Sequence, residues 1–223
     1  MPKKLTWDNI GERVYETGVQ NMVLYPRDAS GTYPTGVAWN GVTDITESPS
    51  GAEATPQYAD NIQYLNLVSA EKYGSTIEAF TYPEEFAECD GSAEIAPGVY
   101  AGQQNRKTFG YSYRTILGND VDLNDHGYKL HLVYGALAAP SEKSYSTVNE
   151  SPDAMKLSWE VSTTPVAVPG FKPTSILTLE STKVDPDKLE QLENILYGSD
   201  SAESRLPLPE EVIALLSDES AQG

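Results

Sequence analysis

Residues 107–117 read KTFGYSYRTIL, and this stretch indicates the fold class most clearly. Bulky side chains stand at Phe109, Tyr111, Tyr113 and Leu117, with small or polar residues between most of them. Because successive side chains of a strand point to opposite faces, this period of two predicts a β-strand with one packed face and one solvent-exposed face.

Two further stretches alternate in the same way, residues 154–162 (AMKLSWEVS) and residues 129–137 (KLHLVYGAL). The expected packed faces are Met155, Leu157, Trp159 and Val161 in the first, and Leu130, Leu132, Tyr134 and Ala136 in the second. Shorter strands are expected at residues 13–15, 22–25, 37–46, 62–67, 76–82 and 175–179. Turn-forming residues separate them at short intervals, which predicts a mainly β chain, an antiparallel β-sandwich or partly closed barrel.

Helix signals gather near the C-terminus. Asp185 before Pro186 is a typical helix start, and Gly198 follows an apolar stripe, so one flanking α-helix is expected near residues 186–197. A shorter helix is expected near residues 209–217. The sequence therefore divides into a β-sandwich domain, residues 1–198, and an acidic tail, residues 199–223, which we expect to be solvated and loosely attached.

The charge balance limits the function classes. The 223 residues include 33 Asp and Glu against 15 Lys and Arg, a net charge of −18. Proteins that hold nucleic acid through its phosphates need clustered Lys and Arg, and anionic membrane surfaces attract basic segments. Both kinds of binding are disfavoured, and no apolar run is long enough to span a bilayer.

No pattern of residues indicates catalysis or a cofactor. Cys89 is the single cysteine and stands among acids, which raise a thiol pKa; His131 is expected on the polar face of its strand. Residues 119–125 resemble the start of a calcium loop, but Asp125 replaces the required Gly and His131 the required Glu. We therefore expect no enzyme, no catalytic residue, no cofactor and no metal site.

Several short segments resemble, in their order and spacing, the major tail protein, or tail tube protein, of siphophages and prophages of Gram-positive bacteria. They are residues 12–19 (ERVYETGV), 37–42 (VAWNGV), 81–86 (TYPEEF), 104–110 (QNRKTFG) and 129–135 (KLHLVYG). The resemblance covers roughly residues 5–197.

The resemblance implies a structural virion protein. Members of this family form hexameric rings of β-sandwich subunits flanked by a helix, and the rings stack into a hollow tube that delivers phage DNA. The implied partners are further copies of the chain, a tape measure protein, a distal tail protein and a tail terminator. The implied location is the virion tail, assembled in the host cytoplasm, with no membrane contact and with DNA passing without specific binding.

The resemblance also implies two sets of site residues. A loop reaching the adjacent ring would correspond to residues 46–61, and its candidate contacts are Ser48, Pro49, Gly51, Glu53, Pro56 and Tyr58. Acidic side chains facing the channel would keep DNA from adhering, and the candidates are Glu47, Asp60, Glu71 and Glu78.

Other interpretations of the sequence stay open. One is a secreted carbohydrate-binding β-sandwich, although Lys3 and Lys4 are not followed by the apolar segment of a signal peptide. Another is a monomeric virion decoration or tail-completion protein of similar fold. A hydrolase that uses an acid pair is the least favoured, since pairs such as Glu84 and Glu85 arise by composition alone.

Overall fold

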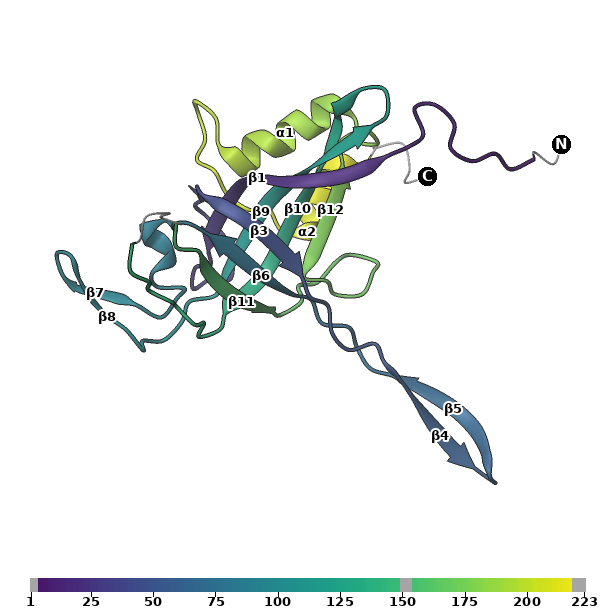
Figure 1. Cartoon of the computed structure of the whole chain (residues 1–223), viewed down its shortest axis with the longest axis horizontal. Coiled ribbons are helices and arrows are strands. Elements are labelled where there is room, and N and C mark those ends of the chain that lie inside the picture. The colour runs from purple at the N-terminus through teal and green to yellow at the C-terminus, as the bar shows by residue number, and fades with distance from the viewer. Residues whose placement is uncertain (1–3, 149–153, 218–223) are drawn as a thin grey trace.

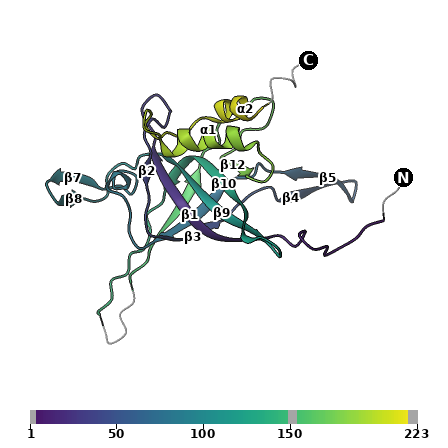
Figure 2. The same cartoon turned by 90° about the horizontal axis from the view of Figure 1, so that it is seen from above.

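Three layers make up the body of the protein, two β-sheet layers and one layer of helices (Figure 1, Figure 2). The computed structural model describes residues 4–148 and 154–217. The first sheet layer contains, in spatial order, β2 (Val37–Ala38), β1 (Tyr15–Pro26), β9 (Phe109–Asn119), β10 (Leu123–Ala138) and β12 (Ile176–Glu180). The second contains β11 (Leu157–Thr163), β6 (Gly74–Ala79) and β3 (Val42–Glu47). Two hairpins project from the body, β4 (Ala54–Ala59) with β5 (Ile62–Val68) and β7 (Ala93–Ala96) with β8 (Val99–Ala101).

The expected mainly β, antiparallel fold with a flanking helix is confirmed. Every pairing between the named strands is antiparallel. The sheet order runs from β2 and β1 at one end to β3 at the other, and β3 returns to lie against β1. No pairing joins β1 to β3 among the described residues, so the barrel stays open at that place.

The long strand β10 connects the two sheet layers. Its first part pairs with β9 and β12, whereas Ala136–Ala138 pairs with β11. The change of layer follows Gly135, which has a φ of +61°. Glycine adopts this left-handed conformation without steric penalty, so Gly135 allows the strand to bend there.

A core rich in aromatic residues fills the space between the two sheet layers. Trp159 of β11 is fully buried, with ring centroids 5.5 Å from Trp39 and 5.2 Å from Phe86, the buried residue of the short 3₁₀ helix η1 (Glu84–Phe86). Tyr111 and Ile77 complete the same cluster. Burial of each large apolar side chain contributes about 1.5–3 kcal/mol, so this core is a major source of stability.

Two helices cover the face of the first sheet layer that points away from the second sheet layer. The expectation that one face of β9 and β10 is exposed to solvent is therefore wrong. A second core forms between this face and the helices α1 (Pro186–Tyr197) and α2 (Pro209–Leu216). Leu132 contributes to this core from β10, while its neighbour His131 is buried on the inner face rather than lying on a polar surface. Ser112 of β9 also faces the helices, where its hydroxyl hydrogen-bonds Tyr25.

The C-terminal segment packs on the body. Leu206 and Val212 are buried in the second core, and the hydroxyl of Tyr134 donates to the carbonyl of Pro207 over 3.0 Å. The expectation of a solvated, loosely attached tail is therefore wrong for residues 204–217, whereas residues 199–203 are exposed. Residues 218–223 of that tail lie outside the described residues, and the division of the chain at residue 198 stays a prediction.

Several element boundaries differ from those expected. The strand expected at residues 22–25 lies within β1, which includes only Tyr15 of the strand expected at residues 13–15. The strand expected at residues 37–46 is divided by Gly41, at φ +78°, into β2 and β3. Met155 is exposed, not packed, because β11 begins only at Leu157. The strands β4, β7 and β8 were not expected.

The start of α1 depends on one side chain, and this gives a first prediction. The Oδ1 atom of Asp185 accepts hydrogen bonds from the backbone N–H groups of Asp187 (3.0 Å) and Lys188 (3.2 Å). Asp185→Ala removes this cap and is expected to lower the free energy of unfolding by about 1 kcal/mol, measured by urea titration. Asp185→Asn keeps an acceptor oxygen and should retain most of the stability; an equal loss in both variants would contradict the capping role.

Candidate functional site

A long β-hairpin projects far from the body, and we call residues 48–73 the arm (Figure 1). Its distal part consists of β4 and β5, joined by Asp60 and Asn61. Both turn residues have positive φ, +51° and +64°, as a type I′ hairpin turn requires. Every residue of β4 and β5 is exposed, so no part of this hairpin packs on its own body.

Backbone hydrogen bonds fix the base of the arm. The N–H of Ser48 donates to the carbonyl of Gly74 over 2.7 Å. Ser50 and Lys72 exchange both of their backbone hydrogen bonds, at 2.9 and 2.7 Å. The arm therefore continues directly from the ends of β3 and β6, and its direction is set by the second sheet layer.

The two faces of the distal hairpin of the arm differ in how many large aliphatic side chains they expose. We call one the apolar face; it consists of Ile62, Leu65 and Leu67 from β5 with Thr55, Gln57 and Ala59 opposite them on β4. The other face carries one large aliphatic side chain, Val68, and there the amide of Gln63 donates to Asn66 over 2.8 Å; the remaining residues of this face are Ala54, Pro56 and Tyr58. Ile62 is 63% exposed and Leu67 is 58% exposed, which is unusual for aliphatic side chains gathered in one stripe.

The expected inter-ring loop corresponds to the outgoing half of the arm. Four of its candidate contacts, Ser48, Pro49, Gly51 and Glu53, precede β4, and the other two, Pro56 and Tyr58, lie in β4. The returning strand β5, which carries the apolar side chains, was expected to be a strand of the body. The alternation of apolar residues in its sequence indicates a strand. Alternation does not distinguish a strand that packs on a core from a strand that is exposed on both faces.

The four residues expected to face the channel do not share one surface. Glu78 points outward from the second sheet layer on β6, while Asp60 lies at the end of the arm and Glu71 near its base. Glu47 points inward and accepts a hydrogen bond from the hydroxyl of Tyr113 over 2.7 Å. Their role in lining a channel stays a prediction.

The outer face of the second sheet layer carries acidic side chains surrounded by short hydroxyl side chains. Asp44 of β3 and Glu78 of β6 lie directly opposite each other in the antiparallel ladder, and Glu160 of β11 lies on the same face. Short hydroxyl side chains occupy the positions around them: Thr46, Thr76, Ser158 and Ser162. Like charges directly opposite each other destabilise a sheet, so Asp44 and Glu78 are not placed there for stability. Sequence reasoning missed Asp44 and Glu160, because nothing in the sequence pairs these strands.

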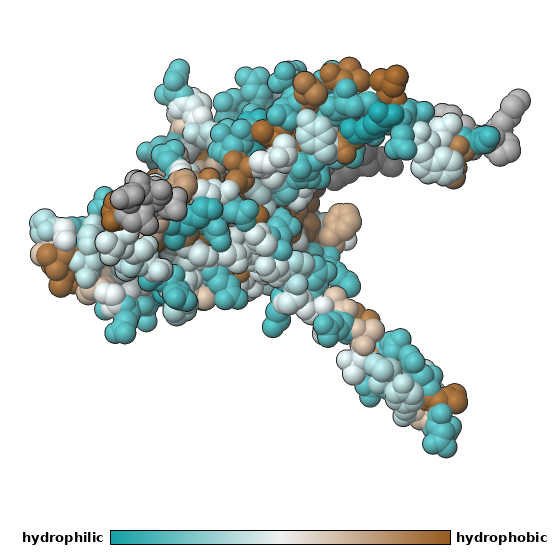
Figure 3. Space-filling view, viewed as in Figure 1, coloured by the Kyte–Doolittle hydropathy of each residue, from teal (hydrophilic) through white to brown (hydrophobic). Residues whose placement is uncertain are grey.

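Two other projections also expose apolar side chains. The N-terminal segment before β1 exposes Leu5, Trp7 and Ile10, at 72%, 75% and 82%. The β7–β8 hairpin exposes Ile95 and Tyr100. Figure 3 shows apolar residues at the end of this hairpin and at the end of the arm. Exposed apolar surface of this kind is typical of protein–protein contacts.

The described residues show no arrangement suited to metal binding or nucleophilic chemistry. No group of His, Cys, Asp and Glu among them is placed to hold a metal ion. The Oδ1 atom of Asn119 accepts from the N–H groups of Val121 and Asp122, so the turn that resembled a calcium loop is closed by its own side chain. Burial raises the pKa of the Cys89 thiol to about 12, so the reactive thiolate is scarce at neutral pH. No helix in residues 4–148 and 154–217 is long and apolar enough to cross a membrane.

Comparisons with known proteins identify no relative by sequence. No family model and no curated protein matches this chain. A chain in the six-fold symmetrised cryo-EM structure of the anti-feeding prophage (AFP) baseplate matches with a TM-score of 0.37 and 9% sequence identity. The alignment covers 78% of this chain and 97% of that chain. The two chains are too dissimilar for the fold or function of one to be assigned to the other.

Proposed function

We propose that this chain is the structural subunit of a phage tail tube and assembles into stacked hexameric rings around a channel for DNA. The arm carries the proposal. An isolated two-stranded hairpin is only marginally stable in water, yet the distal hairpin of the arm is exposed along its whole length and has an apolar face. The hairpin gains stability when another chain covers that face. The sequence resemblance implies that the covering chain is a subunit of the adjacent ring.

The charge distribution supports contact between copies. A net charge of −18 makes two bodies repel each other at long range. Within residues 54–68 the single charged residue is Asp60, at the turn. A distal hairpin with almost no charge lets one acidic subunit contact another with little additional repulsion, while the apolar face of the hairpin supplies the favourable free energy.

The acidic outer face of the second sheet layer fits the wall of a DNA channel. Double-stranded DNA carries about one negative charge per 1.7 Å of its axis, and Lys or Arg on a channel wall would bind its phosphates. Asp44, Glu78 and Glu160 repel phosphates instead, so DNA would pass without specific binding. A map of the assembled tube in which these three side chains point away from the channel would contradict this part of the proposal.

The remaining assignments follow from the same proposal. The protein would be located in the virion tail after assembly in the host cytoplasm. Its partners would be further copies of itself, a tape measure protein, a distal tail protein and a tail terminator. It would act without catalysis and without a cofactor.

Electron microscopy of the purified full-length chain tests the proposal. We expect rings that stack into tubes as the protein concentration rises, or when tail initiation proteins are added, and sedimentation velocity should show large assemblies. Persistent monomers under all these conditions would contradict the proposal and favour a decoration or tail-completion protein. Specific retention on a polysaccharide column would favour the carbohydrate-binding alternative.

The opposed carboxylates on the outer face give a second prediction. Glu78→Gln removes the repulsion with Asp44 and is expected to raise the free energy of unfolding by about 0.2–1 kcal/mol at low salt. The gain should shrink at high salt, because mobile ions screen exposed charges. Glu160→Gln, opposite Thr76, is the matched control and should change stability less. Equal effects in the two variants would show that the Asp44–Glu78 pair is not the cause.

A further inference from the structure

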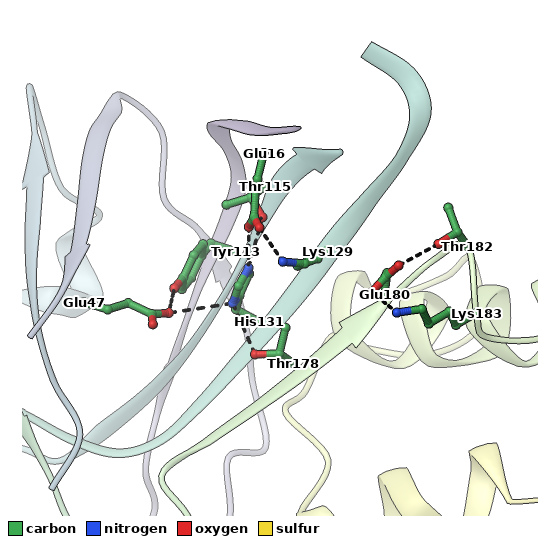
Figure 4. Close-up of polar contacts among 10 residues, drawn as sticks. All are labelled: Glu16, Glu47, Tyr113, Thr115, Lys129, His131, Thr178, Glu180, Thr182 and Lys183. Atoms are coloured by element: carbon green, nitrogen blue, oxygen red, sulfur yellow. Dashed lines mark hydrogen bonds and ion pairs between the residues drawn. The ribbon is translucent and has the colours of Figure 1, made fainter. Parts of the chain in front are cut away.

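A buried histidine lies where the barrel is open, between β1 and β3 (Figure 4). We call this place the seam; its polar side chains are Glu16 from β1 and Glu47 from β3, with His131 from β10 between them. His131 is 7% exposed and its ring stacks on Tyr113, with centroids 4.5 Å apart and planes 2° apart. The proposed assembly of the chain does not use this histidine.

Hydrogen bonds assign the protons of the neutral imidazole. The hydroxyl of Thr115 donates to Glu16, so its oxygen is free to accept the Nε2–H of His131 at 3.0 Å. The Nδ1 atom is then the unprotonated nitrogen, and it accepts from the hydroxyl of Thr178 at 3.4 Å. Each nitrogen also has a carboxylate oxygen at 3.8 Å, Glu16 on the Nε2 side and Glu47 on the Nδ1 side.

The neutral imidazole therefore leaves one unfavourable contact at the seam. The unprotonated Nδ1 atom lies 3.8 Å from an oxygen of the Glu47 carboxylate, and two groups that both accept hydrogen bonds repel each other. Glu47 is held in this position because the hydroxyl of Tyr113 donates to it over 2.7 Å. One proton added to Nδ1 would convert this contact into an ion pair between β10 and β3.

The surroundings of His131 set when that proton is taken up. Burial lowers its pKa below the usual range, while the charges of Glu47 and Glu16 oppose this shift and Lys129 adds to it. Burial alone would raise the pKa of Glu16, but hydrogen bonds from Lys129 and Thr115 hold it below its usual value, so Glu16 stays ionised. His131 is thus neutral at pH 7 and becomes charged only as the pH falls below its ordinary pKa.

We propose that His131 is a proton-operated clasp at the base of the arm, which on protonation binds Glu47 through Nδ1–H and ties β3 to β10 and, through Glu16, to β1. Glu47 directly precedes Ser48, whose N–H group forms the first backbone hydrogen bond of the arm. Closing the clasp therefore restrains the base of the arm, and releasing the proton frees it. The device couples the proton concentration to the stiffness of the arm.

NMR of the unassembled full-length chain tests the clasp by following the imidazole signals of His131 as the pH is lowered. The arm base is followed through protection of the backbone amides of Ser48, Ser50 and Lys72 against hydrogen exchange, corrected for the intrinsic pH dependence. We expect protection of these amides to rise about three- to tenfold as His131 takes up its proton, which corresponds to about 0.5 to 1 pH unit of coupling with Glu47.

The matched variants are Glu47→Gln, which keeps an acceptor for Tyr113 but removes the charge, and Glu78→Gln, which removes a charge from the outer face of the same layer. In Glu47→Gln, His131 should titrate about 0.5 to 1 pH unit lower and the rise in protection should vanish. Glu78→Gln should keep the wild-type titration of His131 and the rise in amide protection at the base of the arm. Protection that stays constant or falls as wild-type His131 protonates would overturn the proposal without any variant, and so would an unchanged His131 titration in folded Glu47→Gln.

Discussion

The double variant Ile62→Asp with Leu65→Asp is expected to abolish tube formation while leaving the subunit folded. Both side chains belong to the apolar face of the arm and touch no part of the body, since every residue of β4 and β5 is exposed. The double variant places two negative charges on the apolar face that the proposal assigns to the contact between acidic subunits. In the proposed tube these charges would be buried against a neighbour, where an unpaired carboxylate costs several kcal/mol.

Two measurements separate assembly from folding. Electron microscopy should show single rings or free subunits in place of tubes, and thermal unfolding of the unassembled subunit should stay within about 0.5 kcal/mol of the wild type, as for most surface substitutions. The control is Gln63→Glu with Asn66→Asp, which adds the same charge to the opposite face of the hairpin. Tubes in the control and none in the test variant would assign the contact to the apolar face. Normal tubes in both would contradict the role of the arm.

The fold was predictable where the local pattern and the tertiary structure agree. The alternation of β11 was correct from Leu157 onward, because its second face is exposed and polar. The start of α1 was also predictable, because Asp185 and Pro186 act on the backbone next to them. In β9 and β10 the pattern was misleading, since the helices that cover their second face come from a distant part of the chain.

The candidate site was predictable only in part, for the same reason. The resemblance implied that residues 46–61 project, and the Pro and Gly content and few apolar side chains of that segment agree with this. The return strand β5 looks like a body strand in the sequence, since alternation does not distinguish a strand that packs on a core from one that is exposed along its whole length. His131 was expected on a polar surface, yet the ring of Tyr113 and the strands β1 and β3 enclose it. Burial of this kind depends on which strands meet at the seam, and no local signal encodes that.

The change of sheet layer at Gly135 was also not predicted by the alternation of residues in β10. Alternation from Leu130 predicts that Ala136 packs with Tyr134, but the two residues lie in different cores. The positive φ of Gly135 and the register shift beside it turn the strand, so the side chain of Ala136 points into the aromatic core between the sheets. The two cores of the protein thus share one strand, and this glycine determines which side chains enter each core.

Gly135→Ala is accordingly expected to lower the free energy of unfolding by about 2–5 kcal/mol in urea titration. A left-handed φ costs a residue with a Cβ about 1–2 kcal/mol, and overpacking costs about 1–3 kcal/mol more. The added Cβ would meet the carbonyl oxygen of Thr164 at 2.2 Å, and that backbone is held by its own hydrogen bond from the Thr164 N–H to the Gly135 carbonyl.

Gly98 in the β7–β8 turn is the matched control, because it has a similar φ of +75° but no atom within 4 Å of the added Cβ. Gly98→Ala should therefore lose only the conformational part, about 1–2 kcal/mol. The difference between the two variants isolates the close approach of β10 to residue 164, which the turn at Gly98 does not have. Equal losses would show that the bend in β10 tolerates a side chain, and the connection between the two cores would then have to be maintained by other contacts, such as the pairing of Ala136 with Thr163.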